Sequence, residues 1–168
     1  MTSWFKKLFN NDNYKPHIDQ GVSATLYPDK IIILTSNKSE EGMWFDTHDF
    51  KILSPNISDE VLGEEIIKAL QKSKYDPINL KDYKEYRKQT LKYLKFKSEK
   101  EFMTDAKFVR IYRKNDSMSI EPRENKFSDG RQRAFKGMPN DKIVIDPHSN
   151  NTTIGQTAKQ AWEKCKIT

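Results

Sequence analysis

Apolar and polar residues alternate along the first third of the chain with the two-residue period of strands. Residues 22–27 place Val22, Ala24 and Leu26 on one face, which predicts a strand. The uninterrupted apolar run 31–34 follows turn residues and predicts a buried strand. Shorter apolar groups predict strands at 44–45, 50–53, 108–112, 118–120 and 143–145, with a polar loop over 35–42 and a charged loop or hairpin over 125–137.

Helical spacing occurs in four other segments. Ser58 is a typical N-cap residue, and the apolar residues that follow it recur at helical intervals. A central helix is predicted over residues 80–95, and the last helix is predicted to be capped by Thr152 or Thr153 and to end near Lys166. A short amphipathic helix is also predicted over residues 4–9.

Two of these segments resemble each other. Residues 55–74 align without a gap on 147–166, at an offset of 92, and Pro55 and Gly63 meet Pro147 and Gly155. The sequence therefore predicts an α+β fold with antiparallel β-sheets, two repeat-related helices and one additional central helix. We expect one domain, 1–168, built from an internal duplication (about 20–74 and 105–168) that is joined by a helical connector, 75–104.

Gly63 and Gly155 lie early in their predicted helices, where glycine costs about 1 kcal/mol relative to alanine. A phosphate-binding helix N-terminus would use such a glycine, but neither helix follows a glycine-rich loop. The alternative is a close approach of backbones, and we expect each helix to pack tightly on its sheet.

The composition limits the possible classes of protein. With 35% hydrophobic and 32% charged residues in a chain of 168, one modest core is expected beneath a charged surface. No apolar run approaches the roughly 18–20 residues that span a bilayer, and the single cysteine, Cys165, excludes an internal disulfide. We therefore expect a soluble cytoplasmic protein without membrane contact.

Candidate catalytic chemistry is sparse. His17, His48 and His148 are scattered without metal-ligand spacing, and no nucleophile is readable beside them. His48 lies between Asp46 and Asp49, a setting that can raise histidine basicity, but it has no evident catalytic partner. We expect no enzyme activity, no metal and no cofactor.

The net charge of +6 suggests a nucleic-acid partner, but it is unevenly distributed. Residues 1–74 sum to −2 and residues 75–168 to +8, while 36–65 alone sum to −6. Aromatic residues alternate with lysine and arginine over 83–97, as in single-strand binding surfaces, although an amphipathic helix explains the same pattern. A basic nucleic-acid-binding module therefore stays open as an alternative function.

One segment resembles a known family. The residues from Leu53 to Gly63 (LSPNISDEVLG), followed by Ala69-Leu70 and Ser73-Lys74, are similar to those of the immunity proteins of contact-dependent growth inhibition, CdiI. The resemblance covers about 20–74 and 105–168. It implies a small cytoplasmic antitoxin that binds the C-terminal toxin domain of a cognate surface protein and blocks a nuclease active site. One branch of the family is paired with toxins that resemble ribonuclease A.

An inhibitor of a basic nuclease is expected to be acidic, whereas this chain has a net charge of +6 and one acidic stretch, 36–65. Either that stretch meets the toxin, or the toxin is not strongly basic. We expect a monomer that contacts the toxin in a 1:1 complex, with Trp44 as an anchor, unless this tryptophan belongs to the core. The alternative surface is the equivalent loop of the second repeat, 125–133. The expected toxin-binding residues are Glu40, Glu41, Trp44, Asp46 and Asp49.

Overall fold

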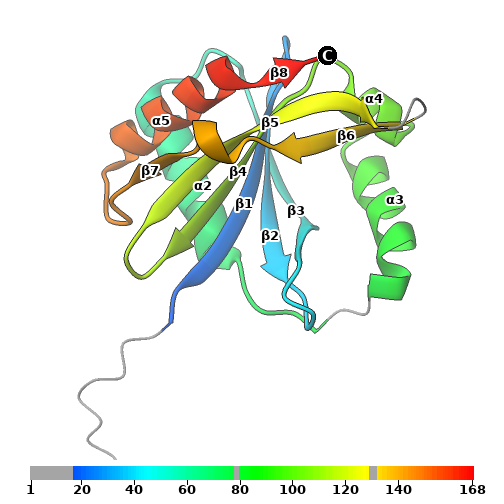
Figure 1. Cartoon of the computed structure of the whole chain (residues 1–168), viewed down its shortest axis with the longest axis horizontal. Helices are drawn as coiled ribbons and strands as arrows, with labels where there is room; N and C mark the ends of the chain where they lie inside the picture. Colours follow the sequence, from blue (N-terminus) through cyan, green and yellow to red (C-terminus); the bar gives the residue numbers. More distant parts are fainter. Residues whose placement is uncertain (1–16, 78–79, 129–131) are drawn as a thin grey trace, which may run out of the picture.

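The computed structural model describes residues 17–77, 80–128 and 132–168, in which eight strands form one sheet (Figure 1). The order is β3-β2-β1-β4-β5-β6, and β7 and β8 also pair with β5. All pairs are antiparallel except the one between β5 and β8, which confirms the α+β class. The strands are β1 (Asp19–Leu26), β2 (Ile31–Lys38), β3 (Trp44–Leu53), β4 (Lys107–Lys114), β5 (Met118–Ser128), β6 (Gln132–Gly137), β7 (Ile143–Ile145) and β8 (Lys166–Ile167).

Helices cover both faces of this sheet (Figure 1). The helices α2 (Asp59–Lys72) and α5 (Asn151–Lys164) lie side by side on one face. Those on the other face are α3 (Tyr83–Tyr93), which the 3₁₀ turn η1 (Leu80–Asp82) precedes, and the short α4 (Glu99–Met103). The helix expected over 4–9 lies outside the described residues.

The apolar run at the start of β2 serves both cores. Ile31 and Ile33 pack under α2 and α5, whereas Ile32 and Leu34 pack under α3 and α4. Because side chains alternate across a strand, only a continuous apolar run fills two faces at once. The prediction of a buried strand is thereby explained by the second helical layer.

Three strands are longer than their apolar residues suggest. The loop predicted over 35–42 is wrong for its first half, because β2 continues to Lys38 with buried polar side chains that bond to neighbouring elements, and it is right for 39–42, which form a turn. The two short strands expected over 44–53 are one strand, β3. The strand expected to stop before Pro122 continues to Ser128. Pro122 lies between the part of β5 that pairs with β7 and the part that pairs with β6. Its carbonyl accepts from the Met138 amide at 3.2 Å, so the missing N–H of proline does not interrupt the strand.

The helix ends follow capping chemistry. Ser58 caps α2 as predicted, its hydroxyl accepting from the Val61 amide at 3.2 Å. The cap of α5 is Asn150 rather than a threonine, because its side-chain oxygen reaches the Thr153 amide at 2.8 Å. The helix ends at Lys164 instead of Lys166, since the chain turns extended there and forms β8 beside β5.

Gly63 and Gly155 permit a close contact between α2 and α5. A Cβ atom on Gly63 would lie 1.8 Å from the carbonyl oxygen of Asn151, and one on Gly155 would lie 1.9 Å from that of Asp59. The predicted close approach is therefore confirmed, but the expected partner is wrong. Each glycine faces the other helix rather than the sheet, because the two helices cross on the same face.

Candidate functional site

The expected acidic site begins at the turn between β2 and β3. The Ser39 amide donates to the Met43 carbonyl at 2.8 Å, and the Ser39 hydroxyl accepts from the Met43 amide at 3.1 Å. Gly42 has a φ of +79°, a conformation that side chains disfavour, so glycine is favoured at this position. The turn thus holds Glu40 and Glu41 in the exposed position expected of contact residues.

Trp44 lies at the base of this turn and is half-buried. Its ring covers Gly21, where a Cβ atom would come within 2.7 Å, and its centroid is 5.5 Å from that of Tyr112. The Lys38 ammonium group lies 5.6 Å from the ring centre. The tryptophan is therefore held in one orientation by its neighbours while part of its surface stays accessible, as an anchor residue requires.

Two large exposed side chains near the turn were missed by the sequence reasoning. Met43 is 59% exposed and Tyr75 is 61% exposed. Met43 could have been found from its place beside Trp44 in an acidic turn. Tyr75 could not have been found, because it reaches the turn only through a β-bridge between Lys38 and Tyr75. Lys38 and Tyr75 line a hollow of about 560 Å³.

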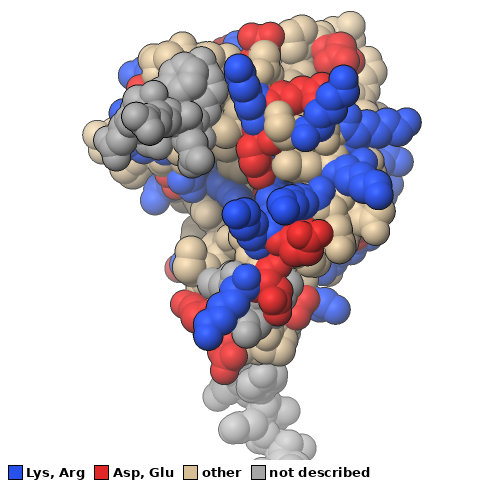
Figure 2. Space-filling view, turned by 90° about the vertical axis from the view of Figure 1, so that its right-hand side faces the viewer, with Lys and Arg blue, Asp and Glu red and all other residues tan. Residues whose placement is uncertain are grey.

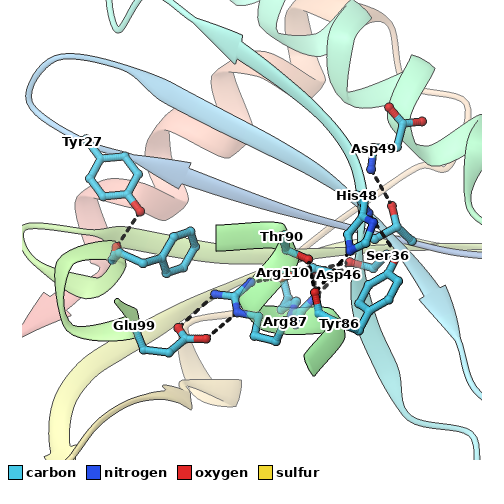
Figure 3. A network of polar contacts seen from close by, with 12 residues as sticks. Tyr27, Ser36, Asp46, His48, Asp49, Tyr86, Arg87, Thr90, Glu99 and Arg110 are labelled. Atoms are coloured by element: carbon cyan, nitrogen blue, oxygen red, sulfur yellow. Dashed lines mark hydrogen bonds and ion pairs between the residues drawn. The ribbon is translucent and has the colours of Figure 1, made fainter. Parts of the chain in front are cut away.

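Asp46 does not share this exposed surface, because it is buried in a network of polar contacts (Figure 3). Its Oδ1 atom accepts from Arg110 Nη1 at 2.7 Å and from the Ser36 hydroxyl at 2.8 Å, and Arg87 lies 3.9 Å from its Oδ2 atom. Burial alone would raise the pKa of Asp46, but the two guanidinium groups and the hydrogen bond from Ser36 together outweigh it and hold the pKa below its usual value.

Arg87 carries this network from the sheet to α3 and α4. Its Nε and Nη2 atoms donate to the two oxygens of Glu99 at 2.5 and 3.1 Å, and its guanidinium lies 4.5 Å from the centre of the Phe102 ring. Asp46 can therefore affect binding only indirectly, by holding in place the elements that its ion pairs connect.

His48 has a structural explanation in the same region (Figure 3). Its ring stacks on Tyr86 at 3.9 Å, and its Nε2 atom lies 3.2 Å from the Tyr86 carbonyl oxygen. Because a carbonyl only accepts, this contact uses Nε2 as the donor. These contacts of His48 with Tyr86 hold β3 against α3.

Asp49 is exposed, but on the other side of β3. It pairs with Lys72 of α2 at 3.1 Å, whereas Asp46 pairs with Arg110 and approaches Arg87 of α3. The five expected residues are therefore not one patch. Glu40, Glu41 and Trp44 share the turn, while Asp46 and Asp49 are separated by the strand itself.

The basic and aromatic stretch forms α3 and the loop after it. The rings of Tyr83 and Tyr86 pack against Phe45, at centroid distances of 6.4 and 6.0 Å, and Phe96 packs against Tyr27 at 5.7 Å. These contacts favour an amphipathic helix over a stacking platform for bases. Of the four expected rings, Tyr93 alone is largely exposed, at 55%.

Metal and thiol chemistry find little support in the described residues. Within 17–77, 80–128 and 132–168, no three His, Cys, Asp or Glu side chains are grouped closely enough to hold a metal ion. Cys165 is partly buried, donates to the Phe108 carbonyl at 3.3 Å, and has a pKa raised by burial. No helix in this part of the chain has the length and apolarity needed to span a membrane.

Comparison with known proteins decides the family. The model of the CdiI family, CDI immunity protein, matches residues 20–165. The chain belongs to the CDI immunity protein family. A search of curated protein sequences gave no significant match.

Two solved structures share the fold of this CdiI-family protein. A protein of unknown function from Neisseria meningitidis has a TM-score of 0.71 at 18% identity, with 88% of this chain and 96% of that chain covered. A chain from a CdiA-CT/CdiI toxin and immunity complex of Yersinia pseudotuberculosis has a TM-score of 0.67 at 20% identity, with 88% and 98% covered. The shared fold covers nearly the whole length of the two solved chains and most of this chain.

Proposed function

We propose that this CdiI-family protein neutralises a nuclease toxin domain by binding it in a 1:1 complex and covering its active site. The family match over residues 20–165 carries the proposal. The related Yersinia fold comes from a toxin and immunity complex, which supports a protein partner. The protein then acts by occlusion in the cytoplasm and needs no catalytic residues of its own.

The turn between β2 and β3 is the proposed contact surface. Nuclease active sites that bind phosphate are basic, so Glu40 and Glu41 would steer the toxin toward the turn. Trp44, held by Gly21 and Tyr112, would bury its accessible part at the centre of the contact.

The two other expected acidic residues take different parts in the proposal. Asp49 lies apart from the turn, on the α2 side of β3, and its ion pair with Lys72 offsets the charge that it would add to the acidic field there. Asp46 contributes through the fold, since its contact with Arg110 ties β3 to β4 across the two strands between them.

Co-production with the toxin tests this function. The C-terminal toxin domain encoded next to this chain is expressed in bacteria with and without the protein, and growth and co-purification are measured. The proposal predicts that growth is restored and that the two proteins co-purify. A toxin domain from a different system is the control and should not be neutralised. Continued growth arrest with the cognate toxin, or purification of the protein with nucleic acid instead, would contradict the proposal.

A further inference from the structure

A basic groove lies along α3, away from the acidic turn. It has a volume of about 1030 Å³ and follows α3 and the loop that leads to α4. Its floor includes Leu91, which is only 6% exposed, with Tyr83 and Phe96 beside it. Figure 2 looks onto this side of the molecule, where lysine and arginine side chains gather over the middle of the face. The lysines that line the groove are Lys84, Lys88, Lys92, Lys95 and Lys97.

The spacing of these lysines disfavours the folded helix. Lys84, Lys88 and Lys92 succeed each other at four-residue intervals, and like charges at this spacing destabilise a helix. Lys88 has a weak partner in Glu85, at 3.7 Å, but no ion pair joins the other four lysines to a carboxylate in the described residues. Glu99, the acidic residue in the groove, is already bound to Arg87.

Lys95 adds a backbone strain at the end of α3. The Phe96 amide donates to the Leu91 carbonyl at 2.9 Å and the Lys95 amide to the Lys92 carbonyl at 3.0 Å, which is a Schellman helix end. The residue at this position of the motif is usually glycine, because φ is positive there, and Lys95 has a φ of 63°. A lysine side chain is thus kept in the groove against the preference of the backbone.

Two features of this surface therefore reduce stability, the four-residue lysine spacing and the strained Lys95. In addition, four exposed ammonium groups of the groove have no carboxylate partner among the described residues. Residues that oppose folding concentrate at functional sites, where a ligand supplies the compensation. An acidic partner would remove the charge repulsion, and an apolar floor suits the side chains of a protein.

We propose that this groove binds an acidic segment of the toxin domain, as a second contact beside the β2–β3 turn. The inference rests on the proposed function and adds the chemistry of the partner to it. The elements that carry the two surfaces are in contact, because the Tyr83 ring of the groove packs on the buried Phe45 of β3, at a centroid distance of 6.4 Å. One partner with a basic and an acidic region can reach both. Nucleic acid is less suited, since Tyr83 and Phe96, the two rings that line the groove, are packed against Phe45 and Tyr27.

Binding of the purified toxin domain to charge variants tests this inference. The test variant replaces Lys84, Lys88 and Lys92 with glutamine. The control replaces three exposed lysines on other elements with glutamine and so removes the same net charge; these are Lys51, Lys114 and Lys164. The groove predicts that the test variant loses about tenfold or more in affinity, more at low salt than at high salt, and that the control changes much less.

Lys95→Gly provides an independent variant, because it relieves the strained backbone while removing a groove charge. It should melt at the same or a higher temperature than the wild type and yet bind the toxin more weakly. A loss of affinity in a protein that is no less stable separates recognition from folding.

The outcomes distinguish the two proposals. If the wild-type protein binds no toxin, the proposed function fails and this inference falls with it. If the wild type binds but the triple variant and Lys95→Gly bind equally well, only the groove is wrong. A labelled single-stranded RNA of 20 nucleotides is the competing probe. If it binds the wild type and loses affinity in the triple variant, while toxin affinity is unchanged, the groove is a nucleic-acid site and the inference is overturned.

Discussion

Gly63 and Gly155 make reciprocal contacts with each other's helix. A Cβ on Gly63 would meet the Asn151 carbonyl oxygen at 1.8 Å, and one on Gly155 would meet that of Asp59 at 1.9 Å. Helix propensity alone predicts that alanine stabilises each helix by about 1 kcal/mol. Because the clash is with backbone, the helices must instead separate, and we expect Gly63→Ala and Gly155→Ala each to lower the unfolding free energy by about 2 kcal/mol or more.

Urea denaturation of these variants gives the sign of the effect directly. Gln71→Ala and Gln160→Ala, at exposed positions of the same two helices, are the controls and should change stability by less than about 0.5 kcal/mol. The double glycine variant should lose less than the sum of the two single variants, because both act on one interface. A stabilised Gly63→Ala protein would show that the close contact is absent.

The internal duplication stays a prediction, with further support. Asp59 and Asn151 are separated by 92 residues, as are Gly63 and Gly155. The strands before the two helices also correspond. Leu53 and Ile145 are 92 residues apart, and they pair with the first residues of β2 and β5. Superposition of residues 31–74 on 118–166 should align β2, β3 and α2 with β5, β7 and α5. Failure of the helices to coincide would contradict the duplication.

Among the five residues expected at the interface, Asp46 is the acidic residue whose substitution should reduce the stability of the fold most. Asn at this position leaves the partly buried Arg110 without its carboxylate partner, so we expect Asp46→Asn to lower the unfolding free energy by about 3 kcal/mol at neutral pH. Because the pKa of Asp46 is lowered in the folded protein, its stabilising contribution is complete above its unfolded pKa of about 3.9. That contribution is lost as the pH falls through the folded value.

Thermal unfolding of the two proteins between pH 7 and pH 3 checks both statements. The difference between wild type and Asp46→Asn should be largest above about pH 5 and should shrink below about pH 4. Asp49→Asn breaks an exposed pair with Lys72 and should change stability by less than about 1 kcal/mol. Equal effects of the two substitutions at neutral pH would mean that Asp46 is not held in a buried network.

The turn residues should affect toxin binding in two different ways. Trp44→Ala should weaken affinity by about 2 kcal/mol, since an anchoring aromatic side chain is removed. Glu40→Gln with Glu41→Gln should mainly slow association, and this effect should fade as salt rises. Surface plasmon resonance at two salt concentrations measures both.

Stability must be measured beside affinity in this series, because Trp44 also covers Gly21 and contacts Tyr112. Met43→Ala serves as a second variant, since Met43 is largely exposed and its loss should leave the fold intact while weakening binding. If folded variants of Trp44, Met43 and the two glutamates all bind the toxin as the wild type does, the turn is not the contact surface.

The periodic parts of the chain were readable from sequence because one local rule fixes each of them. The run Ile31 to Leu34, the cap at Ser58 and the glycine offset each follow from spacing or capping chemistry. The length of β2 was not readable, since its polar residues are buried through bonds to β3 and α2, for example Ser36 to Asp46. Such bonds form only once distant segments are in place.

The candidate site was readable only in part for the same reason. Asp46 and Asp49 form one acidic stretch in the sequence, but the strand turns them to different sides, where Arg110 and Lys72 bind them. The lysine spacing in α3 is visible in the sequence, whereas the positive φ of Lys95 and the groove are not. Exposure, and hence the contact surface, depends on packing between elements.

The central claim is that the protein neutralises a toxin by occupying it, and a titration of toxin activity tests this most directly. A fixed amount of the purified cognate toxin domain is mixed with increasing amounts of the protein, and residual nuclease activity is measured. Occlusion predicts that activity falls in proportion to the added protein and reaches zero at equimolar amounts. Full inhibition by a small fraction of an equivalent would indicate a catalytic action, and undiminished activity at excess protein would contradict the proposed function.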